Sequence, residues 1–320
     1  MKKFRRYFWG VFFFYFIFIH GAIIYYSTHS GADVSGNDPA MAQIAFIICV
    51  ILWISIFVGF LYWIYKSTFV SQKNIREILR NGIRLDGKIL ESKILNSSHQ
   101  SMEKRELTLS LQNMKDEPIL HKMEVLDSKP HQHRFEEGNS AAIRVDSGFT
   151  KIPYWVLDGI QAKINYRLFV IWVLSLIAII GYFVVVYNLE SNGQGWQFFS
   201  FWHPLLISAA SIYFFGGIFY LIFTKILGKF KGRNGIKLKF AGRKTLAKIL
   251  NVSQTGTYIN NQPQVKFNLE YTDHLGRKHL AEIKKIVSLL DVGNLNQQTE
   301  KEIFFLEEDP TQIAFVEDLF

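Results

Sequence analysis

Two long apolar stretches near the start of the chain, at residues 8–26 and 42–65, constrain its fold more than any other feature. Neither stretch contains Lys, Arg, Asp or Glu. A helix needs about 20 apolar residues to cross a bilayer, because each residue adds about 1.5 Å of length. The loop between the stretches, 27–41, carries no Lys or Arg. We therefore expect a hairpin of two transmembrane helices that enters and leaves the membrane on the same side.

The same arrangement recurs later in the chain, shifted by 160 residues. A second pair of apolar stretches lies at 168–186 and 205–223, and the same ungapped shift places Gly82 on Gly242. We interpret this pattern as a tandem duplication. The alternative is a chance similarity of two amphipathic halves, since alternating patterns match one another easily. A signal peptide is a poorer interpretation of the first stretch, because a matching helix recurs in mid-chain.

The polar segment after each hairpin predicts a small β-domain. Alternation of apolar and polar residues, which is typical of half-buried strands, occurs five times in each segment. Five short strands favour a small closed barrel of the OB or SH3 type, since closure removes exposed strand edges. Helical spacing at 71–80 predicts a helix before the first domain, whereas the Gly- and Lys-rich segment 228–243 does not predict one. The predicted strands are 83–95, 105–111, 119–126, 141–145 and 152–156, then 245–252, 264–271, 278–283, 302–306 and 313–316.

The predicted fold class is thus an α+β membrane protein. It has four transmembrane helices in two parallel hairpins, each followed by a mostly-β domain that is OB/SH3-like. The predicted segments are hairpin 1 at 1–70, β-domain 1 at 71–160, hairpin 2 at 161–227 and β-domain 2 at 228–320.

The basic residues predict the orientation of both hairpins. Lys and Arg are dense at 2–6, 66–80 and 225–244, whereas the loops 27–41 and 187–201 carry none. Because cytoplasmic flanks carry the excess of Lys and Arg, both termini and both β-domains are expected in the cytoplasm. We predict a multi-pass protein of a bacterial inner membrane in which both hairpins run the same way.

The charge balance suggests what the chain contacts. It has 36 Lys and Arg against 27 Asp and Glu, which gives a net charge of +9. Such a charge suits anionic lipid headgroups or nucleic acid. Few exposed aromatic residues are predicted on the strands for stacking bases, so we expect headgroups and no nucleic acid. The basic cluster expected to face the lipid comprises Lys225, Lys229, Lys231 and Arg233.

The end of the second copy carries a resemblance to a known family. Residues 303–315, IFFLEEDPTQIAF, resemble the final strand, Asp-Pro turn and strand of a bacterial membrane family known only as a domain of unknown function. The first copy departs from this pattern, with SGFT at 147–150 in place of the Asp-Pro turn, and Gln298 stands where the first copy has Gly138. The resemblance implies transmembrane helices paired with a small β-domain, and it transfers no catalytic residues.

Three histidines are the candidate metal ligands. His121, His131 and His133 offer imidazole nitrogens, and Glu136 follows closely. The alternative is a solvated polar loop, which the neighbouring Pro130 favours. The chain has one Cys, so it cannot form an internal disulfide or a Cys-based metal site. The sequence shows no phosphate-binding loop, dinucleotide fingerprint or nucleophile motif, so we expect no enzyme and no cofactor.

Small residues in the apolar stretches predict helix packing. Helices approach closely at such residues because the bilayer provides little hydrophobic drive for association. The small residues suit either helix packing within one bundle or the interface of a homo-oligomer. We therefore predict a membrane-anchored interaction or assembly module that binds another membrane or cytoplasmic protein or associates with itself, and the alternative is a subunit of an oligomeric channel or transporter. The predicted packing residues are Gly21, Ser55, Gly59, Gly181, Ser208, Gly216 and Gly217.

Overall fold

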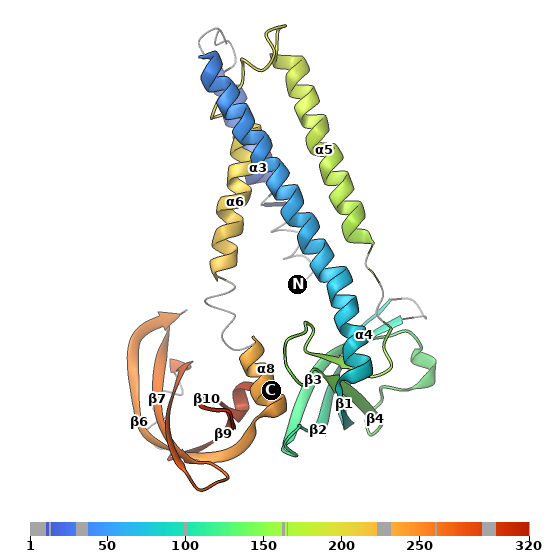
Figure 1. The fold of residues 1–320 in the computed structure, drawn as a ribbon, viewed down its shortest axis with the longest axis vertical. Helices are drawn as coiled ribbons and strands as arrows, with labels where there is room; N and C mark the ends of the chain where they lie inside the picture. Colours follow the sequence, from blue (N-terminus) through green and yellow to red (C-terminus); the bar gives the residue numbers. More distant parts are fainter. Residues whose placement is uncertain are drawn as a thin grey trace. The chain divides into compact units, whose positions relative to one another are not determined.

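The protein is an α+β structure with helices and two five-stranded sheets (Figure 1). This computed structural model describes residues 11–12, 14–29, 38–98, 102–161, 164, 166–222, 232–259, 261–289 and 299–319. The chain divides into two compact units. The helical unit comprises Met1–Gln72 and Lys163–Ile226, and the β unit comprises Lys73–Ala162 and Leu227–Phe320. The two predicted β-domains therefore belong to one compact unit.

The helices before each sheet follow the apolar stretches. Their bounds are η1 (Tyr15–His20), α2 (Gly21–His29), α3 (Pro39–Tyr65), η3 (Lys66–Val70), α4 (Ser71–Asn81), α5 (Arg167–Glu190) and α6 (Pro204–Ile222). α3 begins at a clear start signal, since Asp38 Oδ1 accepts a hydrogen bond from the Ala40 N–H at 3.0 Å and Pro39 takes the first helical position. It continues through the π-helical turn η3 into α4, which confirms the helix predicted at 71–80.

Two of the described helices are long and apolar enough to cross a membrane. They are Pro39–Asn81, which comprises α3, η3 and α4, and Arg167–Glu190, which is α5. α6 is also apolar, but its apolar stretch is shorter and covers Pro204–Ile218. The predicted span at 8–26 is helical from Phe14 onward, while residues 8–10 and 13 lie outside the described part of the chain. The presence of four transmembrane helices therefore remains a prediction.

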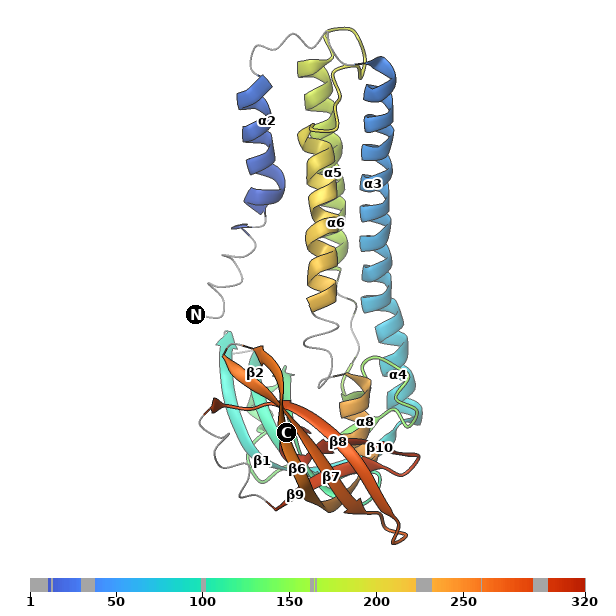
Figure 2. The same cartoon turned by 90° about the vertical axis from the view of Figure 1, so that its left-hand side faces the viewer.

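Aromatic side chains join the helices of the helical unit. Trp53 Nε1 of α3 donates a hydrogen bond to the Leu205 carbonyl of α6 at 3.1 Å. Trp172 Nε1 of α5 donates to the Phe57 carbonyl of α3 at 3.0 Å. α6 also contacts α2 and η1, and Figure 2 shows these helices side by side. The indole donors therefore use carbonyl oxygens of neighbouring helices and link α3 to α5 and α6.

The first sheet forms a half-barrel of antiparallel strands in the order β3-β2-β1-β4-β5. Alternation of buried and exposed residues is regular along its third strand, as the sequence predicts. The last strand is shorter than the predicted 152–156. The bounds are β1 (Ile83–Ser98), β2 (Met102–Gln112), β3 (Pro118–Asp127), η4 (Pro130–Gln132), β4 (Ser140–Val145) and β5 (Trp155–Leu157).

The second sheet forms a nearly closed barrel in the equivalent order, β10-β9-β6-β7-β8. The expectation of a closed barrel is thus nearly met in the second sheet and is wrong for the first. The bounds are α8 (Arg233–Ala241), β6 (Arg243–Ile259), β7 (Gln262–Thr272), β8 (Lys278–Ile286), β9 (Glu300–Leu306), β10 (Asp309–Phe315) and η7 (Val316–Leu319). The sequence did not predict the helix at Arg233–Ala241, which forms because burial of Leu238 and Phe240 outweighs the poor helix propensity of the segment.

The strand pairings of the two sheets correspond at the shift of 160 residues. Gly87 pairs with Leu111 in the first sheet, and Ala247 pairs with Tyr271 in the second. Each pairing has a bulge at the same place, after Ile89 and after Ile249. The register and the bulges depend on the pattern of buried residues, so both segments specify the same strand geometry.

One glycine precedes each sheet at a close backbone approach. A Cβ on Gly82 would lie 2.4 Å from the Ile78 carbonyl oxygen, and a Cβ on Gly242 would lie 2.3 Å from that of Leu238. Both amides close the preceding helix by donating to these same carbonyls. Only glycine fits where the chain leaves the helix so tightly and starts the first strand.

Candidate functional site

The most distinctive place in the β unit is the junction, by which we mean the contact of α8 with the first sheet. α8 lies between the two sheets (Figure 1). Its Phe240 is fully buried, and its ring lies 5.3 Å from the His121 ring of β3. His121 in turn meets the Trp155 ring of β5 edge-on at 4.4 Å. β3 and β5 are the two edge strands of the half-barrel, so α8 covers its open side.

A single apolar core extends across the junction. Buried residues of the first sheet, among them Leu109 and Ile143, pack in one cluster with buried residues of the second segment. The latter are Leu238, Phe240, Phe304, Leu306 and Ala314. Burial of these side chains is the main favourable term, at roughly 1.5–3 kcal/mol for each large one. The half-barrel thus depends on the second segment for part of its core.

Asn113 supplies the polar part of the junction. Its Nδ2 donates to the carbonyls of Lys239 at 3.1 Å and Gly242 at 2.8 Å. Its Oδ1 accepts from the N–H groups of Lys115 at 2.8 Å and Glu117 at 3.1 Å. The side chain is 2% exposed, so these four bonds satisfy a buried amide completely.

The equivalent residue of the second copy makes only local bonds. Asp273 Oδ1 accepts from the N–H groups of Leu275 and Arg277, both at 2.9 Å. Its Oδ2 accepts from the Arg277 guanidinium at 2.8 Å and pairs with the His279 ring at 2.9 Å. These hydrogen bonds hold the pKa of Asp273 below its usual value despite the cost of burying the carboxyl group. The amide at Asn113 therefore retains the turn and adds two donors to the junction.

Glu307 connects the two segments by ion pairs at the edge of the junction. It accepts from Lys115 of the first segment at 2.5 Å and from Arg243 of the second. These two hydrogen bonds lower the pKa of Glu307 to about 2. The side chains of both pairs are about a third exposed, and solvent screens such pairs, so we assign them orientation more than stability.

His121 lies in this core with no hydrogen-bond partner on either ring nitrogen. Burial and the nearby charge of Lys239 lower the pKa of His121 to about 3. Lys239 itself is buried, which lowers its pKa to about 8, and its Nζ donates to the Leu319 carbonyl at 2.8 Å. An unpaired buried imidazole carries an energetic cost, so the junction holds a group that acid can titrate.

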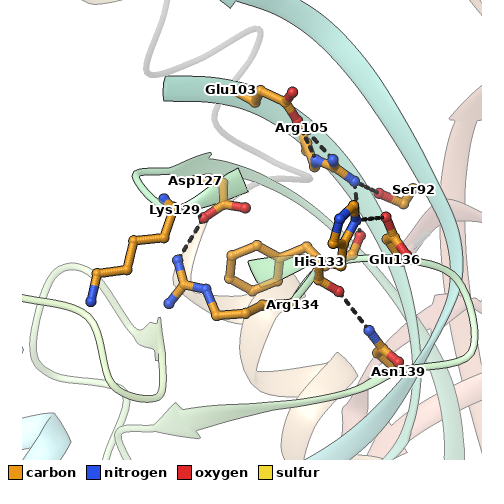
Figure 3. Close-up of polar contacts among 10 residues, drawn as sticks. Ser92, Glu103, Arg105, Asp127, Lys129, His133, Arg134, Glu136 and Asn139 are labelled. Carbon is orange, nitrogen blue, oxygen red and sulfur yellow. Dashed lines mark hydrogen bonds and ion pairs between the residues drawn. The ribbon is translucent and has the colours of Figure 1, made fainter. Parts of the chain in front are cut away.

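The loop 128–139 holds a separate polar network (Figure 3). Arg105 donates to Glu103 at 2.7 Å and to Ser92 at 3.3 Å, and Arg134 donates to the buried Asp127 at 2.5 Å. The loop borders a shallow pocket of about 490 Å³ that also contains Arg84 and Asp158. Each arginine there is paired with a carboxylate, so the pocket has little excess charge to attract an ion.

The three candidate metal ligands do not come together. His133 adopts a left-handed conformation with φ of 50° and hydrogen bonds to Glu136, and His131 is exposed in η4. His121 points into the junction core instead. Among the described residues no group of three or more His, Cys, Asp or Glu side chains is placed to hold a metal ion. The alternation along β3 places His121 on the buried face with Ile119 and Met123, so the sequence carried a signal for its burial that the metal hypothesis did not use.

The predicted packing residues have varied surroundings. A Cβ on Gly21 would meet Ile207 of α6 at 3.7 Å, and Ser55 hydrogen bonds to Tyr213 of α6. Ser208 is buried. The other four have no neighbour within 4 Å of an added Cβ, so their packing role stays a prediction; they are Gly59, Gly181, Gly216 and Gly217.

The predicted basic cluster is described only at its last member. Arg233 begins α8, and its guanidinium donates to the Gly148 carbonyl at 3.4 Å. Lys225, Lys229 and Lys231 lie outside the described residues.

No protein-family model matches this chain, and no curated protein sequence matches it. Among solved structures, one chain of a replication protein A heterotrimer bound to single-stranded DNA is similar at 11% identity and a TM-score of 0.16. The match covers 70% of this chain and 44% of that one. So low a TM-score carries no argument about fold or function.

The Asn113 side chain gives the first prediction. Asn113→Asp removes two donors and places a carboxylate against two buried carbonyls, so we expect a loss of about 3 kcal/mol in the free energy of unfolding of the β unit. The measurement is denaturant unfolding of the full chain in detergent. The matched control is Asp273→Asn, which changes the equivalent turn outside the junction. Equal effects of the two substitutions would contradict the role of Asn113.

His121 gives a prediction about pH. The folded pKa of about 3 lies below the ordinary value of 6.5, so only the unfolded state gains this proton as pH falls below 6.5. The free energy of unfolding should therefore fall by about 1.4 kcal/mol per pH unit from this group between pH 6 and 4.

His121→Leu should remove that slope and stabilise the β unit at pH 7 by about 1–2 kcal/mol, because an unpaired polar group leaves the core. The measurement is thermal unfolding at several pH values, compared with the exposed His131→Leu. A variant whose slope equals that of wild type would show that His121 is paired or hydrated.

Proposed function

We propose that this protein is a membrane-anchored interaction or assembly module without enzymatic activity. The observation that carries the proposal is the shared core, which joins two β segments that are far apart in the sequence into one compact unit. Each segment follows an apolar helical pair in the chain. A unit built in this way restrains both helical pairs and presents a fixed surface to a partner.

The polar groups of the junction support a structural role. The donors and acceptors of Asn113 are occupied by turn and junction bonds, and His121 contacts aromatic rings. Catalytic groups commonly combine a perturbed pKa with access to a cleft, and the perturbed His121 is 6% exposed. The partner of the proposed module is anionic lipid together with another membrane or cytoplasmic protein, or a second copy of this chain.

The proposed topology has four spans in two parallel hairpins with both termini in the cytoplasm of a bacterial cell. The two apolar helices of spanning length support it, as does the lack of Lys and Arg in the loops at 27–41 and 187–201. We further propose a tandem duplication, supported by the strand pairings that recur after 160 residues. The localisation in the inner membrane is proposed from the same distribution of apolar and basic residues.

Labelling of single cysteines tests the topology. In a Cys49→Ala background, Lys122→Cys on β3 and Gln194→Cys in the loop after α5 both add an exposed thiol. A maleimide that cannot cross membranes should label Gln194→Cys in intact spheroplasts and Lys122→Cys only in inverted vesicles. Labelling of both from one side would contradict the parallel hairpins.

Purification from the native membrane tests the function. We expect the full chain, extracted in mild detergent through a C-terminal tag, to bring a stoichiometric companion or a defined homo-oligomer. Asn113→Asp should weaken that association and Asp273→Asn should not. The channel or transporter alternative would be favoured by a different result. In that case the wild-type protein would form a homo-oligomer that conducts ions after reconstitution, and Asn113→Asp would conduct as well.

A further inference from the structure

The helical unit contains a cavity of about 850 Å³ that the proposed module does not use. Residues of η1, α2, α3, α5 and α6 line it, so it is a groove shared by several helices and not a feature of one helix face. The lining residues Ile19, Ile23 and Tyr26 are exposed, so the groove is open to the outside. Its volume falls within the range of about 300–1,000 Å³ that is usual for binding sites of small molecules. Representative lining residues are Phe18, Ile23, Trp53, Phe57, Ala178 and Tyr182.

The walls of this cavity suit a hydrocarbon chain. Most of the lining is aromatic or aliphatic, and three polar lining groups, those of Ser175, Tyr26 and Trp53, have hydrogen-bond partners of their own. Ser175 Oγ donates to the Ile171 carbonyl of its own helix at 2.8 Å. Tyr26 donates its hydroxyl proton to Glu190 at 2.7 Å. A chain of methylene groups gains from burial here without leaving a polar group unpaired.

One wall of the cavity leads to a carboxylate. Tyr26 lines the cavity and contacts Glu190, the last residue of α5. His203 lies beyond it, fully buried, with its Nε2 3.7 Å from Glu190 and its Nδ1 accepting the Leu205 N–H at 3.2 Å. Glu190 is not itself a lining residue, and its carboxylate lies one hydrogen bond away from the lining residue Tyr26. A carboxylate in that position favours a cationic or proton-donating group over an anionic one.

We propose that this cavity binds the acyl chain of a membrane amphiphile whose head carries an ammonium group, which pairs with Glu190. This site is independent of the junction and of the partner of the β unit. The occupant comes from the bilayer, since the lining is the kind of surface that lipid tails wet. The apolar lining residues contact the acyl chain, and Glu190 determines which headgroup is preferred.

Native mass spectrometry of the full chain in detergent tests the proposal. The probes are 1-palmitoyl lysophosphatidylethanolamine and 1-palmitoyl lysophosphatidylglycerol, which share a tail and differ in the head. Wild type should bind one molecule of the ethanolamine lipid about tenfold more tightly than the glycerol lipid, which corresponds to one ion pair of moderate strength. Glu190→Gln should bring the two affinities within about twofold while tail binding persists.

Two tryptophan substitutions on α5 control for the tail. Ala178→Trp fills the cavity and should weaken binding of the ethanolamine lipid at least about tenfold. Val184→Trp adds the same side chain at an exposed position outside the lining and should leave binding unchanged. Unchanged binding to Ala178→Trp, or no stoichiometric lipid on wild type, would overturn the site. Equal affinity of wild type for both heads would overturn the role of Glu190.

Discussion

Burial of Phe240 against the open side of the first sheet is the contact on which the β unit depends. A five-stranded half-barrel leaves two edge strands and an apolar interior uncovered, and neither is stable in water. α8 covers them with Phe240 and Leu238, and Asn113 satisfies the carbonyls at the end of that helix. The second barrel nearly closes on itself. The first segment therefore depends on the second to complete its core, and the second depends less on the first.

The two copies differ where this dependence requires it. Phe240 stands where the first copy has Arg80, and Asn113 stands where the second copy has Asp273. Phe240 and Asn113 both contribute to the junction, whereas the equivalent residues Arg80 and Asp273 do not. His121 is a third, since the second copy has Ala281 there. Two segments with nearly the same strand register thus differ in a few side chains, and we infer that these differences join the half-barrel and the nearly closed barrel into one unit.

Alternation of residues predicted the strands well, because each strand has one buried face over most of its length. The helical continuation at 71–80 was likewise predictable from spacing. The sequence did not reveal α8 or the open first barrel, since both depend on contacts between distant residues, such as Phe240 with His121. The burial of His121 could have been predicted from the alternation of strand 119–126, but its aromatic partners could not. A comparison of the copies offered a signal: an amide at 113 against a carboxylate at 273. The hydrogen bonds of the Trp53 and Trp172 indoles to carbonyls of neighbouring helices were not predicted either, because the acceptors Leu205 and Phe57 lie more than 100 positions away in the chain.

Hydrogen exchange on the full chain in detergent tests the shared core most directly. The comparison is wild type with Phe240→Ala, a substitution that costs about 3–5 kcal/mol in a packed core. If the core is shared, backbone amides of β2 and β3 in the first sheet should lose protection together with those of α8. Loss of protection confined to α8, with β2 and β3 unchanged, would show that the first sheet is stable without the second segment and would contradict the account.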